Sequence, residues 1–171
     1  MQIDIATNTF MQSLQNSPLT VFSKSVAIIF EPIIIVLASL AIAAFLYYKK
    51  RKKESVLLAL TILATGVIIK LAKTIFQRPR PPTMLIPETG FSLPSGHATT
   101  AVVFFGLLAY LFTKNKSRKT KITASIIVTL IILITAFTRL YLQVHWLTDV
   151  LGGIIIGGII LTASIIIYKK F

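Results

Sequence analysis

Apolar residues dominate this chain in five long runs that contain no charged side chain. The runs last between 15 and 19 residues, close to the ~20 residues that an apolar helix needs to cross a bilayer. A buried helix of a soluble protein explains one such run, but not five in succession. Because helices extend past these charge-free cores, we predict five transmembrane helices at about 26–48, 55–76, 97–114, 121–138 and 146–168.

The composition agrees with a membrane protein. Hydrophobic residues make up 55% of the 171 residues and charged residues only 13%. A soluble domain of this size has too little interior to bury so much apolar surface. We therefore predict an all-α fold, an integral-membrane helical bundle that forms one domain over residues 1–171. The absence of cysteine excludes disulfide and thiolate chemistry.

Basic residues lie in short clusters between the apolar runs, so the net charge of +13 does not indicate nucleic-acid binding. With five helices, the clusters at 49–53, 114–121 and 169–170 fall on one side of the membrane. They hold 12 of the 18 basic residues, which marks that side as cytoplasmic. In this multi-pass protein of the cell membrane, the N-terminus and the loop before residue 97 should then lie outside the cytoplasm.

The first 16 residues carry Asp4 and no Lys or Arg, so they lack the basic start of a cleavable signal peptide. Ile3, Phe10, Met11 and Leu14 lie near one helical face. This pattern is compatible with an interfacial helix on the outer leaflet, although the usual basic face is missing. A polar lead-in to the first membrane helix is equally compatible with it.

The side opposite the basic loops collects the unusual polar residues of the chain. Lys73 ends the second helix there, and Arg80 follows in the next loop. Arg139 ends the fourth helix, and both histidines of the chain, His97 and His145, lie on the same side. Three cations and two imidazoles suit a tetrahedral phosphate, because phosphoryl transfer depends mainly on positioning and on stabilisation of charge.

His145 and Asp149 are four residues apart, so they would share one face of a helix. A carboxylate on one imidazole nitrogen would fix the tautomer and leave the other nitrogen free as a nucleophile. Asp149 could equally cap or solvate the start of the fifth helix, and the spacing does not separate these interpretations. Arg139 and His145 are about 240° apart on a helix, so a turn must intervene if both face one point.

The third helix opens at Ser95, Gly96 and His97. Backbone amides at a helix start form an anion site where glycine allows close approach, but Ser95 alone predicts an ordinary N-cap. Lys73 and Arg80 could bind phosphate oxygens or position the protein at the lipid headgroups. The five acidic residues are scattered, so we expect no bound metal or cofactor.

The other notable positions receive structural interpretations. We expect Lys24 or the outer headgroups to compensate Glu31, and we expect Glu88 to be solvated. Gly153 and Gly157 form a small-residue face on the fifth helix, which we assign to close packing inside the bundle.

Three motifs follow one another in the chain: Lys73-x6-Arg80-Pro81, Pro94-Ser95-Gly96-His97 and Arg139-x5-His145-x3-Asp149. They resemble the signature of the type 2 phosphatidic acid phosphatases (PAP2), and the hydropathy pattern resembles the compact prokaryotic members over nearly the whole chain. Thr138 stands where this family usually has serine, and both residues offer a hydroxyl. The first motif contains lysine, which looks more like the phosphatidylglycerophosphatase B type than the undecaprenyl-pyrophosphatase branch, where glutamate is found.

The resemblance implies a metal-independent lipid phosphatase that works through a phosphohistidine. His145 would be the nucleophile, Asp149 would orient it, and His97 would protonate the leaving group. The implied phosphate-binding positions are Lys73, Arg80, Ser95, Gly96 and Arg139. The implied substrates are phosphatidic acid, phosphatidylglycerophosphate and polyprenyl pyrophosphates.

Two alternative functions stay open from the sequence. A lipid could accept the phosphoryl group in place of water, which would make the protein a lipid phosphotransferase. A non-enzymatic protein that binds lipid headgroups would tolerate replacement of both histidines. All three functions involve a membrane lipid and the bilayer, and none involves nucleic acid.

Overall fold

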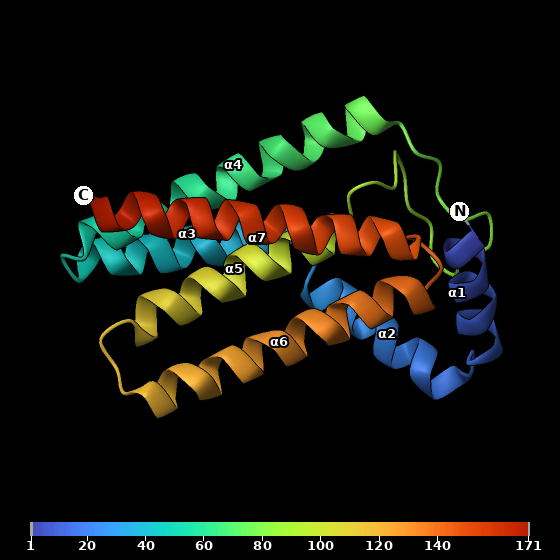
Figure 1. Ribbon diagram of the computed structural model, residues 1–171, viewed down its shortest axis with the longest axis horizontal. Helices are drawn as coiled ribbons and strands as arrows, with labels where there is room; N and C mark the ends of the chain where they lie inside the picture. The colour runs from blue at the N-terminus through green and yellow to red at the C-terminus, as the bar shows by residue number, and fades with distance from the viewer. Residues whose placement is uncertain (1, 171) are drawn as a thin grey trace.

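The structure is a computed structural model that describes residues 2–170, and over that range it contains helices and no strands. The helices α3 to α7 run along the long axis of the molecule, whereas α1 lies across one end of the bundle (Figure 1). The prediction of an all-α bundle is confirmed. The bounds are α1 (Gln2–Ser13), α2 (Ser17–Ile29), α3 (Pro32–Tyr48), α4 (Lys52–Phe76), α5 (Gly96–Thr113), α6 (Arg118–Tyr141) and α7 (Leu147–Lys170).

Four helices, α4 to α7, are long and apolar enough to cross a membrane, and α2 with α3 makes a fifth span if the bent pair counts as one. The prediction of a continuous first helix over 26–48 is wrong, because the chain bends by 44° between α2 and α3. Proline has no amide hydrogen to continue α2, so Pro32 begins a new helix. Glu31 takes extended backbone angles, as a residue before proline usually does.

Close packing of α7 against α5 depends on two glycines. A Cβ added to Gly153 would lie 2.8 Å from the carbonyl oxygen of Ser95, and one added to Gly157 would lie 2.9 Å from that of Thr99. The assignment of these glycines to packing within the bundle is confirmed. This approach brings the start of α7 to the start of α5, where the Ser95 amide donates to the Asp149 carbonyl at 3.0 Å.

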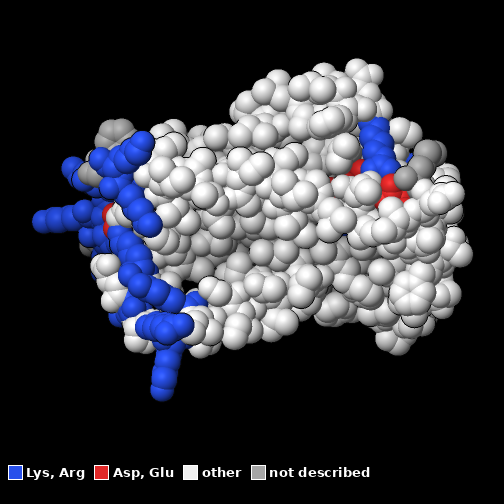
Figure 2. All heavy atoms as spheres, in the orientation of Figure 1, with Lys and Arg blue, Asp and Glu red and all other residues white. Residues whose placement is uncertain are grey.

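The basic clusters gather at one end of the bundle, and an uncharged belt separates them from the other end (Figure 2). Residues within or next to the three clusters meet there: Lys114 Nζ lies 3.0 Å from Glu54 Oε1, and the Tyr168 hydroxyl donates to the same oxygen at 3.2 Å. The prediction that these clusters share one side is therefore confirmed.

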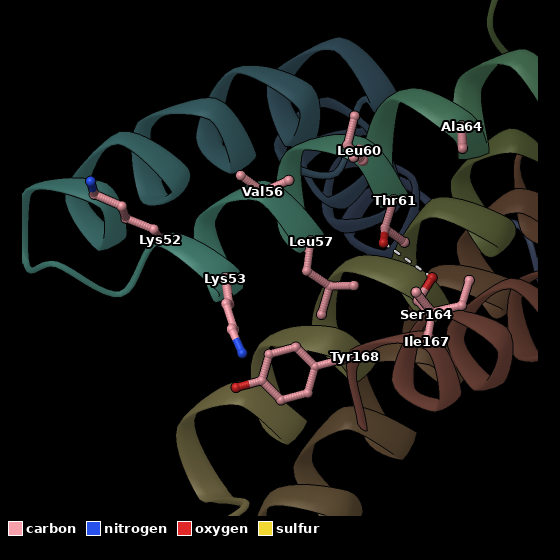
Figure 3. A pocket seen from close by; sticks show the side chains of 10 residues that line it. All are labelled: Lys52, Lys53, Val56, Leu57, Leu60, Thr61, Ala64, Ser164, Ile167 and Tyr168. Atoms are coloured by element: carbon pink, nitrogen blue, oxygen red, sulfur yellow. Dashed lines mark hydrogen bonds between the residues drawn. The ribbon is translucent and has the colours of Figure 1, made fainter. Parts of the chain in front are cut away.

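A largely apolar groove of about 560 Å³ opens between α4 and α7 at the same end, with Lys52 and Lys53 at its rim (Figure 3). Inside it, Thr61 Oγ1 donates to Ser164 Oγ at 3.1 Å. This contact satisfies the hydroxyl groups of two facing helices within an otherwise apolar wall.

The N-terminal segment forms the helix α1, whose location at a membrane interface remains a prediction. Ile3 and Phe10 are more than half exposed, whereas Asp4 is only 2% exposed. A buried carboxylate needs partners, and those of Asp4 lie in the polar cluster at this end of the bundle.

Candidate active site

The predicted site residues come together at the end of the bundle opposite the basic clusters. They are supplied by the end of α4, the loop that follows it, the start of α5, the end of α6 and the segment that leads into α7. Lys73 shares a groove of about 410 Å³ with Gly96, and its charge interacts with those of Arg80, Arg139 and Asp149.

His145 lies in the turn between α6 and α7, and its side chain is buried. The turn forms because Gln143 adopts a left-handed conformation with φ of 58°. Since α7 begins only at Leu147, the expectation that His145 shares a helix with Asp149 is wrong. A turn between Arg139 and His145 was expected, and the structure confirms it.

Asp149 caps α7 and also lies beside the His145 imidazole. Its Oδ2 accepts a hydrogen bond of 2.9 Å from the Trp146 amide, which caps the start of α7. The same oxygen lies 3.6 Å from His145 Nδ1. The capping interpretation is confirmed. Orientation of the imidazole by Asp149 stays a prediction, because His145 Nδ1 lies beside the carboxylate without a hydrogen-bond partner among the described residues.

The pKa of His145 is lowered to about 4, primarily because burial disfavours the charged imidazole. The contact with Asp149 opposes this shift, and the positive charges of Arg139 and Arg80 add to it. The imidazole is therefore neutral near pH 7, and it keeps a lone pair that can attack phosphorus.

Arg80 is held by backbone oxygens and points toward the imidazole. Its guanidinium donates to the carbonyls of Val144 at 2.8 Å, Gly90 at 3.1 Å and Thr89 at 3.2 Å. Its Nη1 also lies 3.4 Å from His145 Nε2. Because carbonyl groups are neutral, these bonds fix the guanidinium without neutralising its charge.

Glu88 bridges Arg139 and Arg80, so the expectation that it is solvated is wrong. Its Oε1 pairs closely with Arg139 Nη2, and its Oε2 lies 3.5 Å from Arg80 Nη2. The loop that carries Glu88 folds back over two cations, and their charge draws the carboxylate inward. Arg139 is 1% exposed, and its Nε is one of the few buried side-chain atoms without a hydrogen-bond partner among residues 2–170.

His97 begins α5 and contacts the bend between α2 and α3. Its Nε2 lies 3.1 Å from the Ala27 carbonyl oxygen and 3.3 Å from Glu31 Oε2. We had expected Lys24 or the headgroups to compensate Glu31, but its carboxylate contacts His97. The pair can share a proton at this position.

Ser95 caps α5, since its hydroxyl oxygen accepts the Ala98 amide, so the N-cap interpretation is confirmed. A Cβ added to Gly96 would meet its nearest neighbour, Pro32 Cγ, at an ordinary 3.8 Å. Packing within the protein therefore does not require glycine here. The role of Gly96 and the Ser95 hydroxyl in binding phosphate stays a prediction.

Two residues of this cluster, Arg78 and Asp4, were not predicted from the sequence. Arg78 donates to Asp149 Oδ1 at 2.6 Å and to Asp4 Oδ2 at 2.7 Å. One signal was present: Asp4 is the single charged residue before Lys24, and a lone carboxylate in a weakly amphipathic segment needs a cation from elsewhere in the chain.

Comparison with known proteins gives two curated relatives. The chain is 32% identical over 119 residues to phosphatidylglycerophosphatase B of Bacillus subtilis, a match that covers 68% of this chain and 59% of that protein. It is 30% identical over 123 residues to an undecaprenyl-diphosphatase of Sulfolobus acidocaldarius. This match covers 68% of this chain and 56% of that protein. The chain spans less than three fifths of the length of each of these relatives.

Two crystal structures share the fold. The transmembrane PAP2 type phosphatidylglycerolphosphate phosphatase from Bacillus subtilis superposes with a TM-score of 0.91 at 24% identity, over 98% of this chain and 85% of that chain. Aquifex aeolicus LpxE gives a TM-score of 0.72 at 23% identity, over 95% of this chain and 94% of that chain. Residues 54–171 match the family model described as the PAP2 superfamily. This multi-pass membrane protein therefore belongs to the PAP2 superfamily.

Proposed function

We propose that this protein is a metal-independent lipid phosphatase that hydrolyses a lipid phosphate or a polyprenyl pyrophosphate through a phosphohistidine. The observation that carries the proposal is the buried, neutral His145, which has Asp149 beside Nδ1 and the Arg80 guanidinium beside Nε2. A neutral imidazole next to a fixed cation combines a nucleophile with a binding group for a phosphate oxygen.

In the first step, the Nε2 lone pair of His145 attacks phosphorus. A phosphorus–nitrogen bond forms while the bond between phosphorus and the lipid oxygen breaks. Asp149 stabilises the positive charge that develops on the imidazole. His97, whose Nε2 lies 3.3 Å from Glu31 Oε2, gives a proton to the leaving oxygen.

In the second step, water attacks the phosphohistidine and transfers a proton to His97. Inorganic phosphate leaves, and His145 regains its lone pair. Lys73, Arg80 and Arg139 stabilise the charge on the phosphoryl oxygens in both steps, together with the backbone amides at Gly96.

The proposed substrate class follows from two sources. The curated relatives are named for phosphatidylglycerophosphate and undecaprenyl diphosphate, both of which join a phosphate group to a long apolar chain. The site lies at the end opposite the basic clusters, so we place it at the outer face of the cell membrane. A lipid whose headgroup lies at that depth can bring its phosphate to Arg139 without leaving the bilayer.

No group of three or more His, Cys, Asp or Glu side chains that could hold a metal ion lies together within residues 2–170. Metal independence is part of the proposal, and a chelator tests it directly. We expect phosphate release from lipid substrates to continue at an unchanged rate in excess EDTA.

The experiment uses the full chain in detergent, with vesicles or mixed micelles of phosphatidylglycerophosphate and of undecaprenyl pyrophosphate. We expect the wild type to release inorganic phosphate and His145→Ala to release none, while Ser13→Ala, at an exposed position of α1, keeps full activity. Full activity of His145→Ala would overturn the mechanism. Labelled phosphate that appears in lipid and not in water would favour the phosphotransferase, and binding without turnover would favour the non-enzymatic function.

A further inference from the structure

Resting on the proposed phosphatase function, we infer that Asp4 and Arg78 are positioning residues that hold Asp149 against His145. In this arrangement α1 completes the active site, although it is far from the three motifs in the sequence. The chain of contacts runs from Asp4 through Arg78 and Asp149 to His145.

The guanidinium of Arg78 joins the two carboxylates. Its Nη1 donates to Asp149 Oδ1 at 2.6 Å, and its Nη2 donates to Asp4 Oδ2 at 2.7 Å. Asp149 is fully buried and Asp4 is 2% exposed. Two buried negative charges thus share one cation, and the arrangement is specific to the planar fork of arginine.

Asp4 also binds the start of α7 directly. Its Oδ1 accepts a hydrogen bond of 2.9 Å from the Thr148 amide, one residue before Asp149. An amide in the first turn of a helix has no partner within that helix, and a negative charge there is favourable. α1 therefore caps the helix that carries Asp149, and it does so from more than 140 residues away in the sequence.

Arg78 is itself fixed by its surroundings. Its guanidinium lies 5.7 Å from the centre of the Trp146 ring, and the indole Nε1 donates to the Pro79 carbonyl at 2.9 Å. Trp146 is adjacent to His145 in the turn. The loop that carries Arg78 is thereby fastened to the segment that carries the nucleophile.

These contacts determine what Asp149 can do. With Oδ1 held by Arg78, only Oδ2 remains for the Trp146 amide and for His145 Nδ1. Without Arg78, the carboxylate could rotate and turn away from the imidazole. Orientation of His145 would be lost, whereas Lys73, Arg80 and Arg139 would still bind phosphate.

The test compares four variants with the wild type: Asp4→Asn, Arg78→Gln, Arg78→Lys and the double change Asp4→Asn with Arg78→Gln. We expect kcat to fall about 10-fold to 100-fold in Arg78→Gln, by analogy with the loss of a group that orients a metal-binding histidine. We expect KM and inhibition by inorganic phosphate to change less than about threefold, because the phosphate-binding cations are intact. Arg78→Lys keeps the charge and should recover part of the lost kcat.

The double variant distinguishes a chain of contacts from two separate structural roles. Because Asp4 acts on Asp149 mainly through Arg78 and only in part through the Thr148 amide, Asp4→Asn should lower kcat much less in the Arg78→Gln background than in the wild type. Effects that multiply in full would show independent roles and would overturn the chain of contacts. Ser13→Ala on the same helix is the matched control and should leave kcat, KM and the melting temperature in detergent unchanged.

The inference is overturned if Asp4→Asn and Arg78→Gln keep the wild-type kcat. It is also overturned if all of their lost activity is accounted for by a smaller folded fraction, measured by size-exclusion chromatography and melting temperature. Failure of the proposed function would look different, since the wild type itself would then release no phosphate from any lipid phosphate.

Discussion

Glu88 occupies the position where the proposed function puts a phosphate group, so its replacement tests how the anion binds. In the present structure its carboxylate neutralises part of the charge of Arg139 and Arg80. A substrate phosphate that uses the same guanidiniums must displace Glu88 first. The free energy of that displacement reduces the affinity that the two arginines could otherwise provide.

The magnitude follows from the contacts. A hydrogen bond to a charged group contributes about 1.5–3 kcal/mol, and Glu88 makes one close contact and one longer contact of 3.5 Å. Its side chain is 24% exposed, so water screens the pair and the lower end of the range applies. Glu88→Gln keeps the shape and removes the charge. We therefore expect the free energy needed to displace residue 88 to fall by about 1.4 kcal/mol, which is a tenfold gain in affinity for the anion.

The assay measures inhibition by inorganic phosphate and by orthovanadate, together with KM for the lipid substrate. We expect the inhibition constants for phosphate and for orthovanadate, and KM for the lipid, to fall about tenfold in Glu88→Gln. Glu54→Gln removes a carboxylate at the opposite end of the bundle and should leave them unchanged. Equal or weaker inhibition in Glu88→Gln would refute the reasoning, because Glu88 would then organise the arginines and not compete for them.

Two other predictions address packing and protonation. Gly157→Ala would place a Cβ 2.9 Å from the Thr99 carbonyl oxygen. The overpacking costs about 1–3 kcal/mol, so the melting temperature should fall. In the control Gly158→Ala the new Cβ meets no atom within 4 Å, so the melting temperature should not change. Protonation of His145 removes its nucleophilic lone pair, so kcat/KM should be lost as pH falls through about 4. An acidic midpoint above pH 6 that is not the titration of the substrate phosphate, whose own second pKa is about 6, would contradict the burial argument.

The sequence was sufficient to predict the bundle and the convergence of the motifs. A bilayer fixes the length of each spanning helix, and consecutive spans must alternate in direction. These two constraints bring Lys73, His97, Arg139 and His145 to one end without any knowledge of packing. The distances between them then depend on loops, which the periodicity of apolar residues does not describe.

The residues that sequence reasoning missed are those whose partners lie far away in the chain. Asp4 and Arg78 are 74 positions apart, and no local pattern couples α1 to the loop after α4. Glu88 was misjudged for a related reason. A charged residue in a polar loop is usually solvated, and only the fold shows that this loop returns over two buried guanidiniums.

The bend at Pro32, which the hydropathy pattern did not reveal, creates part of the site. In a continuous helix the Glu31 amide would bond to the Ala27 carbonyl, but here it bonds to the carbonyl of Ile28. The Ala27 oxygen is one of the carbonyls at the end of α2 that have no partner within the helix. His97 Nε2 lies 3.1 Å from this oxygen. The break thus supplies the group that holds His97.

The N-terminal third of the chain thus has a direct part in the proposed chemistry. The family model begins at residue 54, yet α1 holds Asp149 through Arg78, and the bend after α2 holds His97. The motifs supply the reacting groups, whereas the segment before the family model sets their orientation and proton affinity. Relatives that share the motifs but differ in this segment should therefore differ more in kcat than in their affinity for inorganic phosphate.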